Sequence, residues 1–527
     1  MEIKNKYFFL GGSAVLGFVI ILPILFIIRN SFNIEYSEIA NFIDFKLLTY
    51  LTNTLKLTFY TCVFSIILGV FPAFIISMYA IKMKKLYDIL FILPLAIPCY
   101  IMSFIYADFF GYQGPFLSFL NKLSNQNIKF DILNLECLAF FFALSLYPYV
   151  YATSRIVFNL IGSNYLDLSQ SLGVSKFATL SRVIIPLSFS GVFSGLLLII
   201  MEVFNEYGAV NYFGIETFSN GIFSYWFSLD NKSLAIFLSL VLIVLISILL
   251  IFNYFIKKSN LKLSFNSKLS MNNNFMGKPH LMLYVILLIP ILLGFVLPLV
   301  LLVQNTLDNI HNYHFDDILN LLQNTIFLGL LSSLVIVTIA FYILNVQRSF
   351  KSRFNSIISQ ILTTGYAIPG AIIGLSIMLG LKYMGDSYSV LIGTVFILVY
   401  AYIFRFISVA IFSVKSSLDR QPDMLDDQAK SLELGFFKRL IKLHLPINKY
   451  AIIYAFILVF VDVVKELPIT LILRPFNFNT LATQTYQYAT EEMLAYSSIY
   501  SLTLIIVCTL LLVFSQLIIN KEYVFRS

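Results

Sequence analysis

The chain has 527 residues, of which 59% are hydrophobic and only 12% are charged. Soluble globular proteins carry about 25% charged residues, so this composition excludes a soluble domain with an ordinary polar surface. The formal net charge of +8 does not indicate a nucleic-acid partner, because the basic residues lie in loops between long apolar runs, and we expect none.

The apolar runs are long enough to cross a lipid bilayer, which takes about 20 residues. The first run, Tyr7 to Ile28, is longer than a signal-peptide core and indicates an uncleaved span. A sliding window of about 19 residues predicts twelve spans in an all-α polytopic membrane protein. They lie near residues 8–28, 57–80, 87–107, 134–158, 188–207, 234–256, 281–303, 323–346, 356–382, 388–412, 450–469 and 496–520.

The distribution of lysine and arginine predicts the orientation of these spans. The loops on the N-terminal side of the membrane hold 25 of the 35 basic residues. Cytoplasmic loops are enriched in lysine and arginine, so we expect both termini to be cytoplasmic.

The chain divides into two similar halves of about six spans each. A polar, asparagine-rich segment at 263–280 predicts a cytoplasmic linker between residues 1–262 and 281–527. Several short strings recur in the second half at an offset of 271 or 260 residues. They are Asn53-Thr54 with Asn324-Thr325, Ala96-Ile97-Pro98 with Ala367-Ile368-Pro369, Phe177 with Phe437, Pro186 with Pro446, and Glu206 with Glu466. Parallel repeats of this kind place two bundles around an axis along the membrane normal, with a pathway between them.

A cytoplasmic loop with a repeated pattern follows the fourth span of each half, at 159–187 and 413–449. The first loop reads Asp167-Leu-Ser-Gln-Ser-Leu-Gly173 and leads to Pro186. Its glycine permits a left-handed turn that a side chain would oppose. The second loop has Glu433 at the glycine position and Gly435 two residues later. Either the turn has moved by two residues, or Glu433 adopts it with strain.

Both loops resemble the EAA loop, the signature of the permeases of ABC importers. The resemblance implies two tandem MetI-like bundles in the bacterial cytoplasmic (inner) membrane, coupled to two copies of a separate ATPase subunit. The chain has no phosphate-binding GxxxxGK[ST] sequence, so we expect it not to be an enzyme and to bind no cofactor, with ATP and Mg used by the partner. The coupling residues implied are Asp167, Ser169, Gly173, Pro186, Asp427, Ala429, Glu433, Gly435 and Pro446.

Pairs of acidic residues follow each loop at equivalent positions, Glu202 and Glu206 in the first half and Asp462 and Glu466 in the second. Residues four apart share a helix face, and a charge deep in the membrane costs roughly 2.5–3.5 kcal/mol. We therefore expect these side chains to face the interior between the halves, where hard carboxylate oxygens suit a hard cation. Lys465 could instead neutralise a neighbour, which leaves a purely structural role open.

The segments that begin at Met201 and Asp462, together with Leu93-Pro94-Leu95-Ala96-Ile97-Pro98, resemble the permeases of bacterial ferric-iron ABC importers. This resemblance implies a periplasmic ferric-binding protein as donor. Thiamine, phosphonate and polyamine permeases share the general loop and remain alternatives. An ion-coupled secondary transporter also has twelve spans, but it should lack the two loops. His311 and His314 lie among acidic residues in an outer loop, a weaker metal candidate because such loops are usually solvated rims.

Overall fold

The fold is described from a computed structural model that covers residues 2–34, 39–40, 42–112, 114–125, 130–259, 277, 279–350 and 352–526. Every regular element in these ranges is helical. Most of the expected linker, 263–276 and 278, lies outside the described residues. The first half contains α1 (Glu2–Asn30), α3 (Leu48–Ser65), α4 (Phe71–Met78), α5 (Lys84–Ile92), α6 (Cys99–Phe110), α7 (Pro115–Ser124), α8 (Leu135–Ser171), α9 (Lys176–Thr179), α10 (Ile185–Asn205), α11 (Gly208–Tyr212), α12 (Phe218–Phe223) and α13 (Lys232–Ser259).

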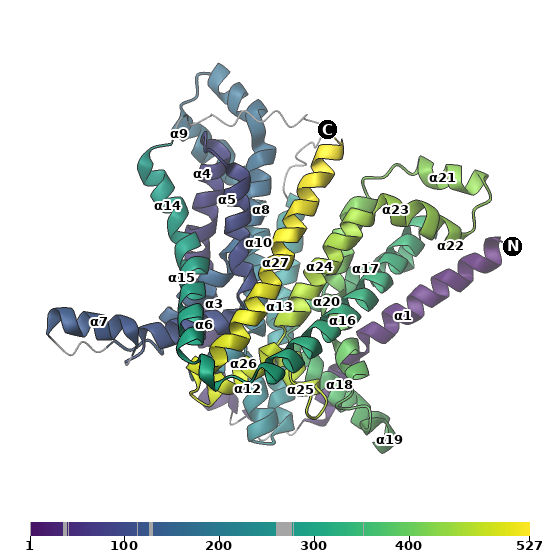
Figure 1. Cartoon of the computed structure of the whole chain (residues 1–527). Coiled ribbons are helices and arrows are strands. Elements are labelled where there is room, and N and C mark those ends of the chain that lie inside the picture. The colour runs from purple at the N-terminus through teal and green to yellow at the C-terminus, as the bar shows by residue number, and fades with distance from the viewer. Residues whose placement is uncertain are drawn as a thin grey trace.

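The second half follows the same order of elements, and Figure 1 shows the two bundles side by side. Its helices are α14 (Leu281–Ile291), α15 (Leu297–Asp308), α16 (Phe315–Phe350), α17 (Arg353–Leu362), α18 (Gly370–Met384), α19 (Asp386–Ser389), α20 (Val395–Leu418), α21 (Met424–Ser431), α22 (Phe436–Arg439), α23 (Leu445–Ile447), α24 (Lys449–Lys465), α25 (Pro468–Leu473), α26 (Leu481–Thr490) and α27 (Leu494–Arg526).

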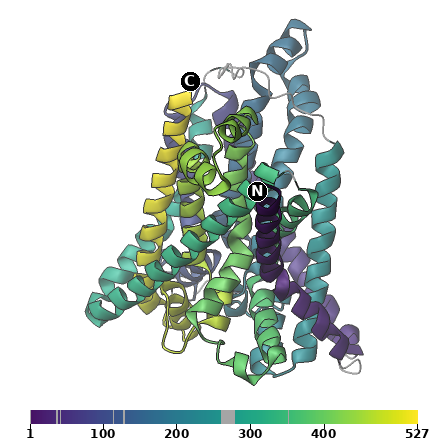
Figure 2. The same cartoon turned by 90° about the vertical axis from the view of Figure 1, so that its right-hand side faces the viewer.

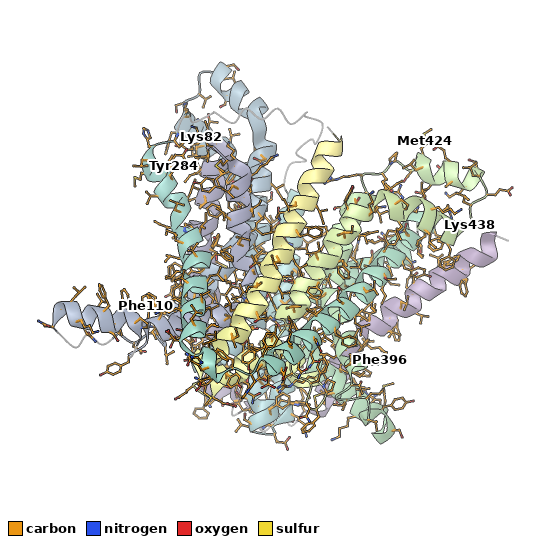
Figure 3. The ribbon with its side chains drawn as sticks, viewed as in Figure 1. Lys82, Phe110, Tyr284, Phe396, Met424 and Lys438 are labelled. Carbon is orange, nitrogen blue, oxygen red and sulfur yellow. The ribbon has the colours of Figure 1, made fainter. Side chains whose placement is uncertain are left out.

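The described residues contain nine straight segments long and apolar enough to cross a membrane, and three bent helix pairs raise the number to twelve. Each of the twelve predicted spans overlaps one of these segments or pairs, so the prediction of a twelve-span helical protein is confirmed. Both chain ends lie in the upper half of Figure 1, on the side that carries α9 and α21. Figure 3 places Lys82 and Lys438 on this side and Phe110 and Phe396 toward the opposite one.

The third span of each half is broken at the repeated Ala-Ile-Pro string. Ile97 and Ile368 are extended, with φ/ψ of −97/110° and −85/124°, because the ring of a following proline disfavours the helical conformation. A new helix begins directly after each proline, at Cys99 in α6 and Gly370 in α18. The expected spans at 87–107 and 356–382 run across these breaks.

Prolines also explain four π-helical turns inside the spans. A proline in a helix lacks an N–H donor and clashes with the carbonyl four residues back, and a π turn relieves this local mismatch. Each π turn ends two residues before a proline, at Ile66–Val70 before Pro72, Leu180–Ile184 before Pro186, Leu292–Val296 before Pro298, and Leu440–His444 before Pro446.

The first span of each half packs largely against the other half. Helix α1 lies along α17 and α18, as both views show (Figures 1 and 2). The Tyr400 hydroxyl donates to the Val19 carbonyl at 2.6 Å, and Tyr147 in α8 donates to the Pro290 carbonyl of α14 at 3.4 Å. Because the first span of each half packs against the other half, the two bundles share an interface.

The repeated Asn-Thr string fastens the outer loop that follows the fifth span. Asn53 and Asn324 donate to the carbonyls of Glu216 and Asn479 at 3.2 and 3.1 Å. The threonine hydroxyls accept from the first N–H groups of α12 and α26. The repeat therefore preserves the architecture that supports the ends of α10 and α24.

Candidate translocation site and coupling loops

The acidic residues lie where the fifth span of each half ends. Helix α10 ends at Asn205 and α24 at Lys465, and Glu206 and Glu466 follow in the same extended conformation. Their carboxylates accept hydrogen bonds from the N–H groups of Ala209 and Ile469 at 3.1 and 3.2 Å. Each glutamate thus also caps the short helix after it, α11 or α25.

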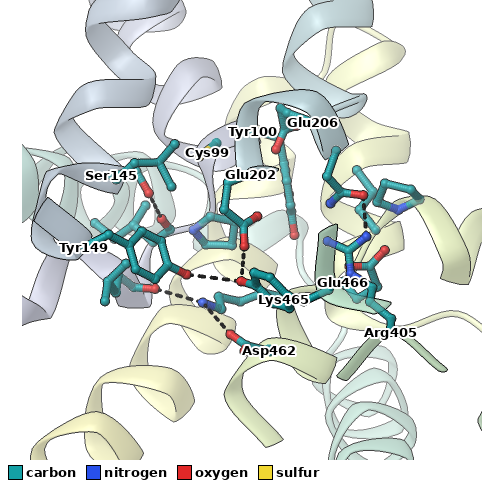
Figure 4. A pocket seen from close by; sticks show the side chains of 18 of the residues that line it. Cys99, Tyr100, Ser145, Tyr149, Glu202, Glu206, Arg405, Asp462, Lys465 and Glu466 are labelled. Atoms are coloured by element: carbon teal, nitrogen blue, oxygen red, sulfur yellow. Dashed lines mark hydrogen bonds and ion pairs between the residues drawn. The ribbon is translucent and has the colours of Figure 1, made fainter. Parts of the chain in front are cut away.

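All four acidic residues, Glu202, Glu206, Asp462 and Glu466, line one cavity between the halves (Figure 4). Its volume is about 70 Å³, which leaves room for only a few water molecules. The carboxylates therefore face the interior of the protein, in a small cavity.

Two basic side chains of the second half share the cavity with these acids. Arg405 in α20 pairs with Glu466, with its Nε 3.4 Å from Oε2, and Lys465 pairs with Asp462 at 3.4 Å. Arg405 is only 2% exposed, so its charge is neutralised inside the protein by Glu466 and does not reach the membrane surface. An arginine within an apolar span is itself a signal for an interior site.

Glu202 and Glu206 form no ion pair within the described part of the chain. The Tyr366 hydroxyl donates to Glu202, and the Tyr149 hydroxyl lies 3.4 Å from that of Tyr366. Four carboxylates thus face two cations, so the ionised site carries a surplus of negative charge. Neither tyrosine was predicted as a site residue, because aromatic side chains in apolar spans usually serve to pack the spans against one another.

The two loops end their helices with the same turn. In the first loop Gly173 has φ +71°, and the Val174 N–H donates to the Ser169 carbonyl at 2.9 Å. In the second loop Glu433 has φ +53°, and the Leu434 N–H donates to the Ala429 carbonyl at 3.2 Å. These bonds close a Schellman-type cap 260 residues apart.

The alternative that the second turn has moved to Gly435 is therefore wrong. Gly435 has an ordinary φ of −62° and is the N-cap residue of α22, so Glu433 itself carries the left-handed conformation. The Ser169 hydroxyl lies 2.6 Å from that of Thr179 and fastens the first turn to α9. The side chain of Asp167 lies outside the described residues.

The histidines of the outer loop do not form a metal site in the structure. His311 is on an exposed turn after α15, and His314 is exposed just before α16. Within the described ranges, no three histidine, cysteine, aspartate or glutamate side chains are grouped so that they could hold a metal.

Comparison with known proteins decides the family. The family described as "Binding-protein-dependent transport system inner membrane component" matches residues 63–261 and again residues 342–522, which together exceed half of the chain. The chain belongs to this family. It is therefore a multi-pass permease component of the cytoplasmic membrane, and its two matches coincide with the two helical bundles.

Individual relatives differ in the substrate that their names give. The Fe(3+)-transport system permease protein FbpB 2 of Haemophilus influenzae is 23% identical over 93% of this chain and 94% of its own length. The sulfate transport system permease protein CysT of Salmonella typhimurium is 25% identical over 30% of this chain and 55% of its own length. The permease is thus similar over nearly its full length to a ferric-iron transporter, and over a shorter segment to sulfate transporters.

The left-handed conformation of Glu433 gives a prediction for the permease. This conformation costs a residue with a side chain roughly 1–2 kcal/mol, and glycine avoids most of that cost. We expect Glu433→Gly to be tolerated and to stabilise the loop by about 1 kcal/mol, which slows amide hydrogen exchange in 424–440 about fivefold.

The matched control is Gly435→Ala, because Gly435 has an ordinary φ and a Cβ there would meet no atom within 4 Å. It should leave exchange nearly unchanged. Faster exchange in Glu433→Gly would mean that the Glu433 side chain makes a stabilising contact of its own.

A buried ion network fastens the second loop to the end of the eighth span and to the segment that leads into the eleventh. Asp426 in α21 accepts from Arg348 Nε at 2.6 Å and lies 2.9 Å from His444 Nε2. Burial alone would raise the pKa of Asp426, but the hydrogen bonds from His444 and Arg348 outweigh it and lower the pKa to about 2. This carboxylate therefore contributes its full stabilisation above its ordinary pKa of 3.8 and loses it as the pH falls toward 2.

We expect Asp426→Asn to loosen this loop at neutral pH. Removing one partner of a buried ion pair costs roughly 3–5 kcal/mol, so trypsin should cleave at Lys430 and Lys438 much faster in the variant. The adjacent Asp427→Asn is the control, because Asp427 is exposed and its ion pair among the described residues is with the exposed Lys430, at 3.1 Å. Equal cleavage of the two variants would contradict an anchoring role for Asp426.

Proposed function

We propose that this permease translocates ferric iron, delivered by a periplasmic binding protein and driven by a dimer of separate ATPase subunits. The observation that carries the proposal is the cavity between the halves, in which four carboxylates face only two basic side chains. The full-length similarity to a Fe(3+)-transport permease supports the same substrate.

The charge of the cavity favours a cation over the sulfate named for other relatives. An opposite charge 4 Å from a carboxylate gains roughly 4 kcal/mol at an effective dielectric constant of 20, and an anion is repelled by as much. Ferric iron is a hard cation that prefers oxygen ligands, and the unpaired carboxylates of Glu202 and Glu206 supply them. Translocation requires that this binding be weak enough for release.

The two loops are proposed as the docking surfaces for the ATPase subunits. Each exposes two large apolar side chains at equivalent positions, which are Leu172 and Phe177 in the first loop and Leu432 and Phe437 in the second. Large exposed apolar side chains on one face favour a protein interface. Both loops lie on one side of the molecule, the side of α9 and α21 in Figure 1.

In this proposal that side is cytoplasmic, and ATP and Mg bind to the partner. The coupling residues are those of the two turns and the prolines that follow: Asp167, Ser169, Gly173, Pro186, Asp427, Ala429, Glu433, Gly435 and Pro446.

The proposal is tested by purifying the permease with its ATPase and measuring ATP hydrolysis in liposomes. The binding protein is added with ferric iron, sulfate, thiamine, phosphonate or a polyamine. Only the ferric form should stimulate hydrolysis. Stimulation by another ligand would reassign the substrate, and ATP-independent uptake would favour the ion-coupled alternative.

A further inference from the structure

Two equivalent residues at the helix ends reach across to the opposite half of the permease. Asn205, the last residue of α10, accepts through Oδ1 from the Gly370 N–H at 2.7 Å. Lys465, the last residue of α24, donates through Nζ to the Leu95 carbonyl at 3.2 Å. Leu95 and Gly370 flank the Ala-Ile-Pro breaks of the two third spans. The same repeat position therefore ties each half to the broken span of the other.

Ion pairs link the crossing residues to the acidic residues of the cavity, directly for Lys465 and through Arg405 for Asn205. Lys465 also pairs with Asp462 at 3.4 Å. Arg405 Nη1 donates to the Asn205 Oδ1 at 2.5 Å, while its Nε pairs with Glu466 at 3.4 Å. The repeat position that holds Lys465 in the second half holds Asn205 in the first, and Arg405 corresponds to Ser145. The second half thus supplies both basic side chains.

The packing around Gly370 is tight within the second half, at the point where Asn205 reaches it from the first half. A Cβ on Gly370 would lie 2.6 Å from Glu466 Oε1 and 3.3 Å from Arg405 Nη1. Only glycine allows this close packing, while the bonds of Asn205 to Gly370 and of Lys465 to Leu95 join the two halves at the level of the cavity. A cavity of about 70 Å³ cannot pass an ion with its ligands unless these contacts separate.

We propose that Asn205, Lys465 and Arg405 form a latch that closes the pathway at rest, and that an incoming cation opens it by competing with Lys465 for Asp462. This inference rests on the proposed function in one respect, that the cavity lies on the pathway. A trivalent cation attracts a carboxylate more strongly than a lysine ammonium does at the same distance. Once Asp462 turns to the cation, Lys465 loses its charge partner and only its bond to Leu95 remains. The ends of α10 and α24 then separate from the broken third spans, and this separation opens the pathway.

Cys99 is a native reporter for the state of this latch, because it is buried and lines the same cavity (Figure 4). The remaining cysteines, Cys62, Cys137 and Cys508, are replaced by alanine. The permease is reconstituted with its ATPase, and a small membrane-impermeant methanethiosulfonate is added from the outside. Labelling of Cys99 is measured by mass spectrometry, at rest and during ATP hydrolysis.

The latch variant is Lys465→Met combined with Asp462→Asn, which removes both charges and leaves no unpaired buried ion. At rest, the variant should label on the order of tenfold faster than the parent, the factor that 1.4 kcal/mol of lost contacts gives. Lys465→Arg keeps a charged donor and should remain protected. Asn205→Leu removes the opposite contact and should also label faster, so the test survives if one variant fails to assemble. Lys232→Met is the control, because Lys232 is exposed and, in the part of the chain that the structure describes, pairs with the exposed Asp230.

The outcomes separate the latch from the proposed pathway. Faster labelling of the latch variants at rest, with the parent labelled only during ATP hydrolysis, supports the latch. If the parent labels during hydrolysis but both latch variants stay protected at rest, the pathway stands and the latch is wrong. If Cys99 labels in no variant and under no condition, the cavity does not lie on the pathway and both proposals fail.

Discussion

Replacing Glu202 and Glu206 together by glutamine is expected to lower ferric-iron uptake by more than about tenfold, while ATP hydrolysis by the assembled complex changes little. These two glutamates are the cavity carboxylates that form no ion pair in the described structure. Glutamine keeps the acceptor oxygen that caps α11 at Ala209, so the fold is retained. A tenfold fall in uptake corresponds to about 1.4 kcal/mol, so the lost attraction of each carboxylate for the cation need contribute only about 0.7 kcal/mol.

The choice of residues follows from the pairing in the cavity. Glu466 is equivalent to Glu206 in sequence, but its neutralisation would leave the buried Arg405 without its partner, which costs roughly 3–5 kcal/mol. Asp316→Asn is the control, because Asp316 is an exposed acid in the first turn of α16. A parallel fall in uptake and hydrolysis would assign the two glutamates to structure or coupling. An unchanged uptake would remove them from the pathway.

Gly173→Val is expected to abolish coupled transport while the permease still inserts in the membrane. Gly173 has φ +71°, a conformation that a β-branched residue avoids most strongly. No atom lies within 4 Å of a Cβ placed there, so the effect comes from the backbone and not from a clash. The turn between α8 and α9 should open, and the first docking surface should lose its shape.

Uptake and ATP hydrolysis are measured on the variant reconstituted with its ATPase. Gly173→Asn should retain most activity, because asparagine tolerates the left-handed conformation. Gly11→Val in α1 is the control, because Gly11 lies outside the coupling loops, has no positive φ, and a Cβ there meets no atom within 4 Å. Normal ATP-driven uptake by Gly173→Val would exclude a coupling role for this turn.

Hydropathy predicted the twelve spans, because the cost of polar groups in lipid depends on local sequence alone. It did not predict the breaks at Ile97 and Ile368, since a proline in a membrane span is compatible with either a kink or a break. The packing of α1 and α14 against the opposite half was also not predicted. It depends on which apolar faces meet in three dimensions, and apolar spans look alike in sequence.

The four carboxylates were predicted to face inward from the energetic cost of exposing them to lipid. Lys465 was considered as a neutralising neighbour and does pair with Asp462, but Arg405 and Tyr366 were not predicted as partners, because they come from other spans. The turn at Glu433 was left undecided for a different reason. A left-handed glutamate and a shifted glycine turn differ by only about 1–2 kcal/mol, which local sequence does not resolve. The repeat decides it, since the same cap forms 260 residues earlier around Gly173.

The most direct measurement is the uptake of radioactive ferric iron into liposomes that contain the permease and its ATPase, with the loaded binding protein outside and ATP inside. The account predicts iron accumulation that requires both ATP and the binding protein, and no accumulation of radioactive sulfate under the same conditions. Accumulation of sulfate with no uptake of iron would contradict it.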